Sequence, residues 1–208
     1  LDQHKRRLGL LTPIVKGWCT ETAQEVASLS LQCHGGMGYI EETGIAQIVR
    51  DARILPIYEG TNGIQAMDLV VRKIIGDKGL AINELIADMR KSLSSLLPGS
   101  PLLSSQIDRF KGSVDDLEKT VSLLLKHSTN RKFSGSVAFD VLMMTSTITA
   151  AWQMLVSVER AQLAFESNKV SSEFFDDKTT TAQYFIDSIL PRYVGHFITI
   201  SSTDTGVK

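Results

Sequence analysis

The stretch LSSQIDRFKGSVDDLEKTVSLLL, residues 103–125, carries the clearest structural signal in this 208-residue sequence. Its apolar residues recur at alternating steps of four and three: Leu103, Ile107, Phe110, Val114, Leu117, Val121 and Leu124. Such spacing places them on one side of an α-helix, where they can pack against other helices. The stretch therefore predicts a long amphipathic helix within a helical assembly.

Helical spacing extends to both sides of this stretch. Towards the C-terminus we predict a second long helix over residues 137–165 and a third over 184–200, bent at Pro191 because proline interrupts the backbone hydrogen bonds of a helix. Towards the N-terminus, residues 80–97 predict another helix. Between it and the opening stretch, Pro98-Gly99-Ser100-Pro101 predicts a linker.

The first 80 residues also predict helices. Thr12 and Pro13 are expected to cap and open a helix that ends near Cys33, before three glycines. A short helix over residues 41–52 should then turn Ile45, Ile48 and Val49 inward. After the break at Pro56, a further helix is expected from Glu59 or Thr61 to Gly76 or Gly79.

No segment shows the sustained two-residue alternation of a half-buried strand. We therefore predict an all-α fold, a helical bundle, with a first unit over residues 1–80 and an additional helical layer over residues 81–208.

Composition narrows the classes of function. Lys and Arg total 22 against 23 Asp and Glu, a formal charge of −1, which gives no support to nucleic-acid binding. No apolar run approaches the length that crosses a bilayer, so we expect no membrane insertion. The chain opens on Leu1 without the features of a signal peptide, and we expect upstream residues to have been removed and the protein to be cytoplasmic.

Cysteine and histidine give little sign of chemistry. Cys19 and Cys33 should lie on one helix about four turns apart, too far for a disulfide. We expect two reduced thiols in the core or at its boundary, and no metal site. His127 and His196 have no evident partner acid in the sequence, which favours structural roles for both.

The first motif that can carry chemistry is QCHGGMGY, residues 32–39, a glycine cluster at a helix end where backbone can approach a ligand closely. Its spacing and the lack of a preceding strand argue against a dinucleotide fingerprint. An esterase-like oxyanion loop would need a Gly-x-Ser-x-Gly nucleophile, which the sequence lacks. Taken alone, the motif also fits a plain helix end and turn.

The second motif is RDARILPIYEGTNGIQ, residues 50–65, in which Glu59 lies between apolar residues and a glycine at a predicted helix start. On its own this arrangement fits a carboxylate that complements the helix dipole, with Thr61 as the cap.

Taken together and in this order, the two motifs closely resemble the C-terminal domain of acyl-CoA dehydrogenases, and the resemblance covers residues 11–73. From about Leu80 onward the sequence resembles, more loosely, the extra C-terminal helical domain of the long acyl-CoA dehydrogenases, a branch that includes the 3-methylmercaptopropionyl-CoA dehydrogenases.

The resemblance implies a role for each matching residue. Glu59 corresponds to the base that removes the α-proton of an acyl-CoA thioester while the β-hydrogen passes to the flavin of FAD, and an apolar pocket would raise the proton affinity of such a carboxylate. The backbone N–H of the same residue is expected to polarise the thioester carbonyl. By the same correspondence Gln32, Gly35, Gly36 and Thr61 contact FAD, the first three reaching a cofactor bound mainly to a neighbouring subunit.

The family also implies a homo-oligomer, an electron acceptor, and two further domains that complete the site. The fragment alone is therefore expected neither to hold FAD nor to catalyse. Many relatives carry Gln where this chain has Gly63, so one flavin contact is lost or is replaced by Asn62. The alternative function is a non-catalytic helical interaction or oligomerisation module that keeps these motifs by descent.

Overall fold

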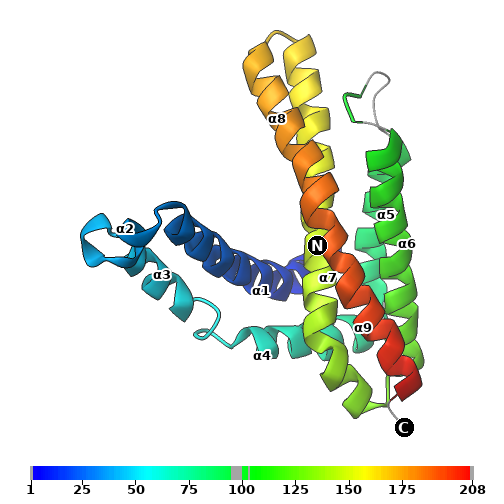
Figure 1. Ribbon diagram of the computed structural model, residues 1–208. Helices are drawn as coiled ribbons and strands as arrows, with labels where there is room; N and C mark the ends of the chain where they lie inside the picture. Colours follow the sequence, from blue (N-terminus) through cyan, green and yellow to red (C-terminus); the bar gives the residue numbers. More distant parts are fainter. Residues whose placement is uncertain (1, 95–99, 103, 207–208) are drawn as a thin grey trace.

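The computed structural model describes residues 2–94, 100–102 and 104–206, and every regular element within these ranges is helical, as predicted (Figure 1). The N-terminal elements are α1 (Asp2–Cys33), α2 (Gly36–Tyr39), η1 (Glu41–Thr43), α3 (Ile45–Ile54), α4 (Asn62–Met67) and the π-helical η2 (Asp68–Ile75). The C-terminal elements are α5 (Leu80–Ser94), α6 (Ser104–Lys126), α7 (Arg131–Glu166), α8 (Ser172–Tyr184), η3 (Phe185–Ile189), η4 (Leu190–Arg192) and α9 (Tyr193–Gly206).

The two parts differ in shape. Helices α5 to α9, which we call the bundle, pack alongside one another, and α1 runs outward from them (Figure 1). Residues 15–64, which we call the arm, follow α1 away from the bundle, turn through α2 and α3, and return through α4.

Helix α1 begins earlier than predicted, at Asp2, so Pro13 lies inside the helix and does not open it. Proline cannot donate the usual backbone hydrogen bond at this position, which weakens a helix. The helix continues because Leu10 and Ile14, on either side of Pro13, are both buried in the core. Tertiary packing here outweighs the local signal. The predicted end of the helix at Cys33 is confirmed.

The region predicted as one helix over residues 41–52 contains the short turn η1 and then α3. The prediction that Ile48 faces inward is wrong, because 54% of this side chain is exposed. Ile45 and Val49 are half-buried, and Ala52 is the residue of α3 that is buried. Within the described chain, α3 therefore covers little of its apolar surface.

The bundle is centred on α7, a 36-residue helix. The apolar seam of α6 packs into the core as predicted: Phe110, Val114, Leu117, Val121 and Leu124 are buried, and Ile107 is half-buried. By length and composition α7 could cross a membrane, contrary to the expectation that no segment is long and apolar enough. However, 61% of its most apolar window is buried within the protein, so its apolar character is accounted for by packing.

The last predicted helix, over residues 184–200, is interrupted as expected at Pro191, which lies in the 3₁₀ turn η4 before α9. The preceding helix α8 was not predicted, since only Thr179 and Ala182 of it are buried and its apolar pattern is weak. In the predicted linker, Pro98 and Gly99 lie outside the described residues, as does Leu103 of the seam.

One hydrophobic core runs through α1, η2 and the bundle, with Leu10, Leu69, Leu85 and Leu142 among its members. The division into units at residue 80 remains a proposal. Cys19 and Cys33 both lie on α1 and are unbonded, as predicted, but both are exposed, so their expected place in or beside the core is wrong.

Candidate functional site

Glu59 lies in the loop that joins α3 to α4, with an exposed side chain. Its backbone φ is 55°, a left-handed conformation that residues other than glycine seldom adopt, and Gly60 follows with φ 81°. Holding a glutamate in this region costs about 1 kcal/mol or more and persists only where the surroundings fix the backbone. The backbone from which the exposed carboxylate projects is thus held in one defined conformation.

Three of the hydrogen bonds that hold the loop are the most informative. The backbone N–H of Asn62 donates to the carbonyl of Pro56 at 3.1 Å, which closes the loop at its base. The backbone N–H of Tyr58 donates to the carbonyl of Ile54 at 3.1 Å. The side-chain amide of Gln65 donates to the carbonyl of Glu59 itself at 3.3 Å. No described residue forms the apolar pocket that the sequence led us to expect around the carboxylate.

Asn62 is the best-connected residue of this region, and only 4% of it is exposed. Its amide nitrogen lies 3.2 Å from the carbonyl of Gly17, 2.9 Å from Oγ1 of Thr20 and 2.8 Å from Oε1 of Glu21. Its amide oxygen accepts from Nζ of Lys16 at 2.8 Å. Both polar ends of Asn62 are thus engaged by α1, so it does not replace a flavin contact at Gly63. Sequence reasoning missed this network because its members are more than forty positions apart.

Thr61 caps α4, as the structural interpretation of the motif expected. Its hydroxyl oxygen accepts from the backbone N–H of Ile64 at 3.3 Å, and the side chain is exposed. A Cβ added at Gly63 would meet only Oγ1 of Thr61, at 3.8 Å. The backbone of this chain therefore has room for a side chain at this position.

The glycine motif lies at the far end of the arm, where α1 gives way to α2 (Figure 1). Gln32 is exposed in the last turn of α1. Gly35 has φ 58°, and a Cβ added at Gly35 or Gly36 would meet nothing within 4 Å. Gly38 differs, since its Cβ would lie 2.4 Å from the carbonyl oxygen of Leu31. Gly38 serves close packing, whereas Gly35 and Gly36 leave an open backbone surface.

The predicted site residues therefore fall into two exposed groups on the arm. Glu59 and Thr61 share the loop before α4, and Gln32, Gly35 and Gly36 share the turn after α1. In the described parts of the chain, no three or more His, Cys, Asp or Glu side chains gather in a way that could hold a metal.

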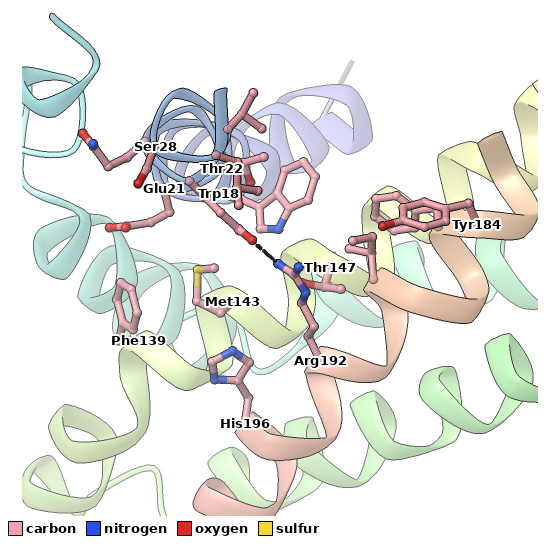
Figure 2. Close-up of a pocket in the computed structure, with 16 residues that line it drawn as sticks. Trp18, Glu21, Thr22, Ser28, Phe139, Met143, Thr147, Tyr184, Arg192 and His196 are labelled. Atoms are coloured by element: carbon pink, nitrogen blue, oxygen red, sulfur yellow. Dashed lines mark hydrogen bonds and ion pairs between the residues drawn. The ribbon is translucent and has the colours of Figure 1, made fainter. Parts of the chain in front are cut away.

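A separate cavity of about 720 Å³ lies between α1 and the bundle, lined by Trp18, Glu21, Met143 and other residues (Figure 2). Arg192 crosses to Glu25 there, with Nη1 at 2.7 and 2.9 Å from the two carboxylate oxygens. None of the predicted site residues lines this cavity.

Both histidines that seemed to lack an acid have one. Nδ1 of His196 lies 2.8 Å from Oδ1 of Asp140, and Nε2 of His127 contacts Asp204. These acids are 56 and 77 positions away, too far for a sequence pattern to reveal. Both pairs join α9 to the rest of the bundle, which agrees with structural roles for the histidines.

Comparison with known proteins finds, along almost the whole chain, the same family that the two sequence motifs resemble. Residues 1–74 match the family described as acyl-CoA dehydrogenase, C-terminal domain, and residues 81–207 match acetyl-CoA dehydrogenase C-terminal like. The chain is 40% identical to 3-methylmercaptopropionyl-CoA dehydrogenase of Ruegeria pomeroyi, over 94% of this chain and 33% of that protein. It is 28% identical to the broad-specificity linear acyl-CoA dehydrogenase FadE5 of Mycobacterium tuberculosis, over 88% of this chain and 31% of that protein.

Two solved structures share the fold. An acyl-CoA dehydrogenase from Bacillus anthracis, complexed with FAD, superposes with a TM-score of 0.68 at 18% identity, over 96% of this chain and 33% of that one. Caenorhabditis elegans ACDH-11, in complex with C11-CoA, superposes with a TM-score of 0.63 at 22% sequence identity. The match covers 89% of this chain and 30% of that one. The chain spans about a third of the length of these relatives. It belongs to the acyl-CoA dehydrogenase family, of which it represents the C-terminal region.

Proposed function

We propose that this chain is part of a flavin-dependent enzyme that oxidises acyl-CoA thioesters to 2,3-enoyl-CoA, with Glu59 as the base that removes the α-proton. The observation that carries the proposal is the backbone of Glu59. A glutamate held in the left-handed region by a closed loop, with its carboxylate projecting outward, is the kind of local strain found at functional sites.

The chemistry assigns distinct roles to side chain and backbone. A carboxylate can take the proton from Cα when the thioester lies within hydrogen-bond reach of it. A backbone N–H directed at the thioester carbonyl would stabilise the negative charge that develops on that oxygen. We assign this N–H to Glu59, so that one residue would hold the carbonyl and accept the proton.

The residues present also fit the edge of FAD, which supplies the acceptor for the β-hydrogen when it is bound. Gly35 and Gly36 offer open backbone, and Gln32 offers an exposed amide beside them. Thr61 offers a hydroxyl whose proton remains free to donate while its oxygen caps α4. All four contacts lie on the surface of the arm, so the rest of the cofactor would be held by elements outside this chain.

We therefore propose that the isolated chain is inactive and binds FAD weakly or not at all. An electron acceptor and a homo-oligomer, in which the glycine turn reaches the cofactor of a neighbouring subunit, belong to the same proposal, and cytoplasmic location is proposed from the sequence alone. An exposed base also needs water excluded around it, which the described residues do not do.

The experiment compares the complete protein with its Glu59→Gln variant. Glutamine keeps the size of the side chain and cannot take the proton, so turnover should fall by a factor of about 10³ or more while bound flavin is retained. Exchange of the exposed Glu173 for glutamine on α8 is the matched control and should leave turnover unchanged. Near-normal turnover in Glu59→Gln would refute the assignment of the base.

A further inference from the structure

The residue that fixes the Glu59 loop in space is Asn62, and this inference rests on the proposed role of Glu59. The backbone N–H of Asn62 closes the loop on Pro56 at 3.1 Å, while its buried side chain is held by α1 on both sides of the amide. The backbone and side chain of one residue thus connect the loop to a long helix. A polar side chain that is 4% exposed and fully hydrogen-bonded permits little movement.

The part of α1 that holds Asn62 is itself fixed by α7. A Cβ added at Gly17 would lie 2.6 Å from Cδ2 of Leu142, so the two helices are in close contact at this glycine. One turn away, the hydroxyl of Ser146 donates to the carbonyl of Leu142 on its own helix at 2.6 Å, and its oxygen also lies 3.4 Å from the carbonyl oxygen of Ile14 on α1. The carbonyl of Gly17 is also an acceptor for Asn62. Contacts therefore run without interruption from α7 through α1 to the loop.

We propose that Asn62 is a positioning residue for Glu59 and that α7 braces it through α1. This gives the additional C-terminal helices a role in catalysis without contact with substrate: they fix the direction in which the base projects. The strained φ of 55° at Glu59 makes such bracing necessary, because an unbraced loop would relax toward a more favourable backbone conformation. A displacement of about 1 Å at the base is enough to lower a rate about a hundredfold.

The first test uses Asn62→Asp in the complete protein. The exchange keeps the size of the side chain but turns a donor into an oxygen that faces Glu21 and the Gly17 carbonyl. We expect kcat to fall about 10- to 100-fold with flavin content and KM little changed. The deuterium isotope effect at Cα should rise, because proton removal becomes slower relative to the other steps. Asn83→Asp, on the exposed side of α5, is the matched control.

A second pair of variants leaves Asn62 in place and covers the case in which Asn62→Asp does not fold. Lys16→Met removes the nearer of the two donors to the Asn62 oxygen, the other being the Thr20 hydroxyl at 3.2 Å, and should lower kcat in the same way, whereas Lys16→Arg should restore most of it. Gly17→Ala should also lower kcat by pushing α1 from α7, and adding Leu142→Ala should recover part of the loss by restoring space.

The outcomes separate the two proposals. If Glu59→Gln is inactive but Asn62→Asp and Lys16→Met both keep kcat within about twofold and an unchanged isotope effect, the positioning role is wrong and the base assignment stands. If Glu59→Gln remains active, the proposed function itself fails. A loss of flavin or folding in Asn62→Asp, together with normal kinetics in Lys16→Met, would also overturn the positioning role.

Discussion

The arm and the bundle differ in the burial of their apolar side chains. In the bundle they form the core: Phe110, Leu117, Leu124, Leu142 and Ile148 are all fully buried. In the arm the buried apolar side chains, apart from Pro56, are the small ones of Ala27 and Ala52. Of the larger ones, Trp18, Leu31, Ile45, Val49 and Leu55 are half-buried, and the rest are exposed: Val15, Val26, Leu29, Met37, Tyr39, Ile40, Ile48, Ile54, Ile57, Tyr58 and Ile64.

This difference supports the proposed role of the arm. Where many large apolar side chains are exposed in one region of a folded protein, that surface indicates a place where something else binds. The two proposed groups of site residues lie in the same region as that surface, since Glu59 follows Tyr58 and the glycine turn lies between α1 and α2. The bundle, together with the start of α1 and η2, buries most of its large apolar side chains, whereas most of those in the arm are exposed beside the proposed site residues, as expected for one side of a larger site.

The largest expected contrast uses two aromatic residues, one from each region. Phe110 in α6 is fully buried and Tyr39 in the arm is 80% exposed. Phe110→Ala should lower the free energy of unfolding of the isolated chain by about 3–5 kcal/mol, through lost burial and the cavity left behind. Tyr39→Ala should change it by less than about 0.5 kcal/mol. Urea unfolding followed by circular dichroism measures both, and equal losses would remove the distinction between the regions.

A smaller contrast lies within the arm. Gly38→Ala would place a methyl group 2.4 Å from the carbonyl oxygen of Leu31, whereas Gly36→Ala would meet nothing within 4 Å. We expect the first exchange to destabilise the isolated chain by about 1–3 kcal/mol and the second to be nearly neutral. Thermal unfolding of the two variants in parallel tests this. A destabilised Gly36→Ala chain would show that the turn after α1 is already covered.

The smallest expected effect belongs to the bundle and depends on pH. Tyr193 of α9 donates to Oδ2 of Asp116 at 3.1 Å, and burial, aided by that carboxylate, raises the pKa of its phenol to about 12. Because this pKa lies above the unfolded value of about 10, the stabilisation is fully present below about pH 10 and is lost as the pH rises towards 12. Tyr193→Phe should cost about 1 kcal/mol at pH 8, with the difference from the parent chain shrinking above pH 10. A difference that stays constant up to pH 12 would contradict the role of the phenol.

The same comparison explains what the sequence could and could not predict. The seam from Phe110 to Leu124 predicted both a helix and its buried face, because within the bundle the spacing and the packing agree. In the arm the spacing of Ile48 with its neighbours also predicted a helix, but no described residue buries Ile48, so the predicted burial failed. The spacing of apolar residues in a sequence predicts which side of a helix is apolar. It does not predict which other residues cover that side.

For the candidate site, sequence motifs located Glu59, Thr61 and the glycine turn but not what holds them. The left-handed backbone of Glu59 and the bonds from Lys16 and Thr20 to Asn62 arise only when α1 and α4 meet. Likewise Pro13 argued for a helix start on local grounds and was overridden by the burial of its neighbours. What holds the site residues, and what lets α1 continue through Pro13, depends on contacts between segments that are distant in the sequence.

The central claim is that the arm completes a site together with parts of the protein outside this chain. Amide hydrogen exchange of the isolated chain and of the complete protein with bound FAD tests it most directly. We predict that α6 and α7 exchange slowly in both samples, whereas α2, α3 and the loop around Glu59 exchange fast in the isolated chain and become protected in the complete protein. Equal exchange of the arm in the two samples, whether fast or slow, would contradict the account.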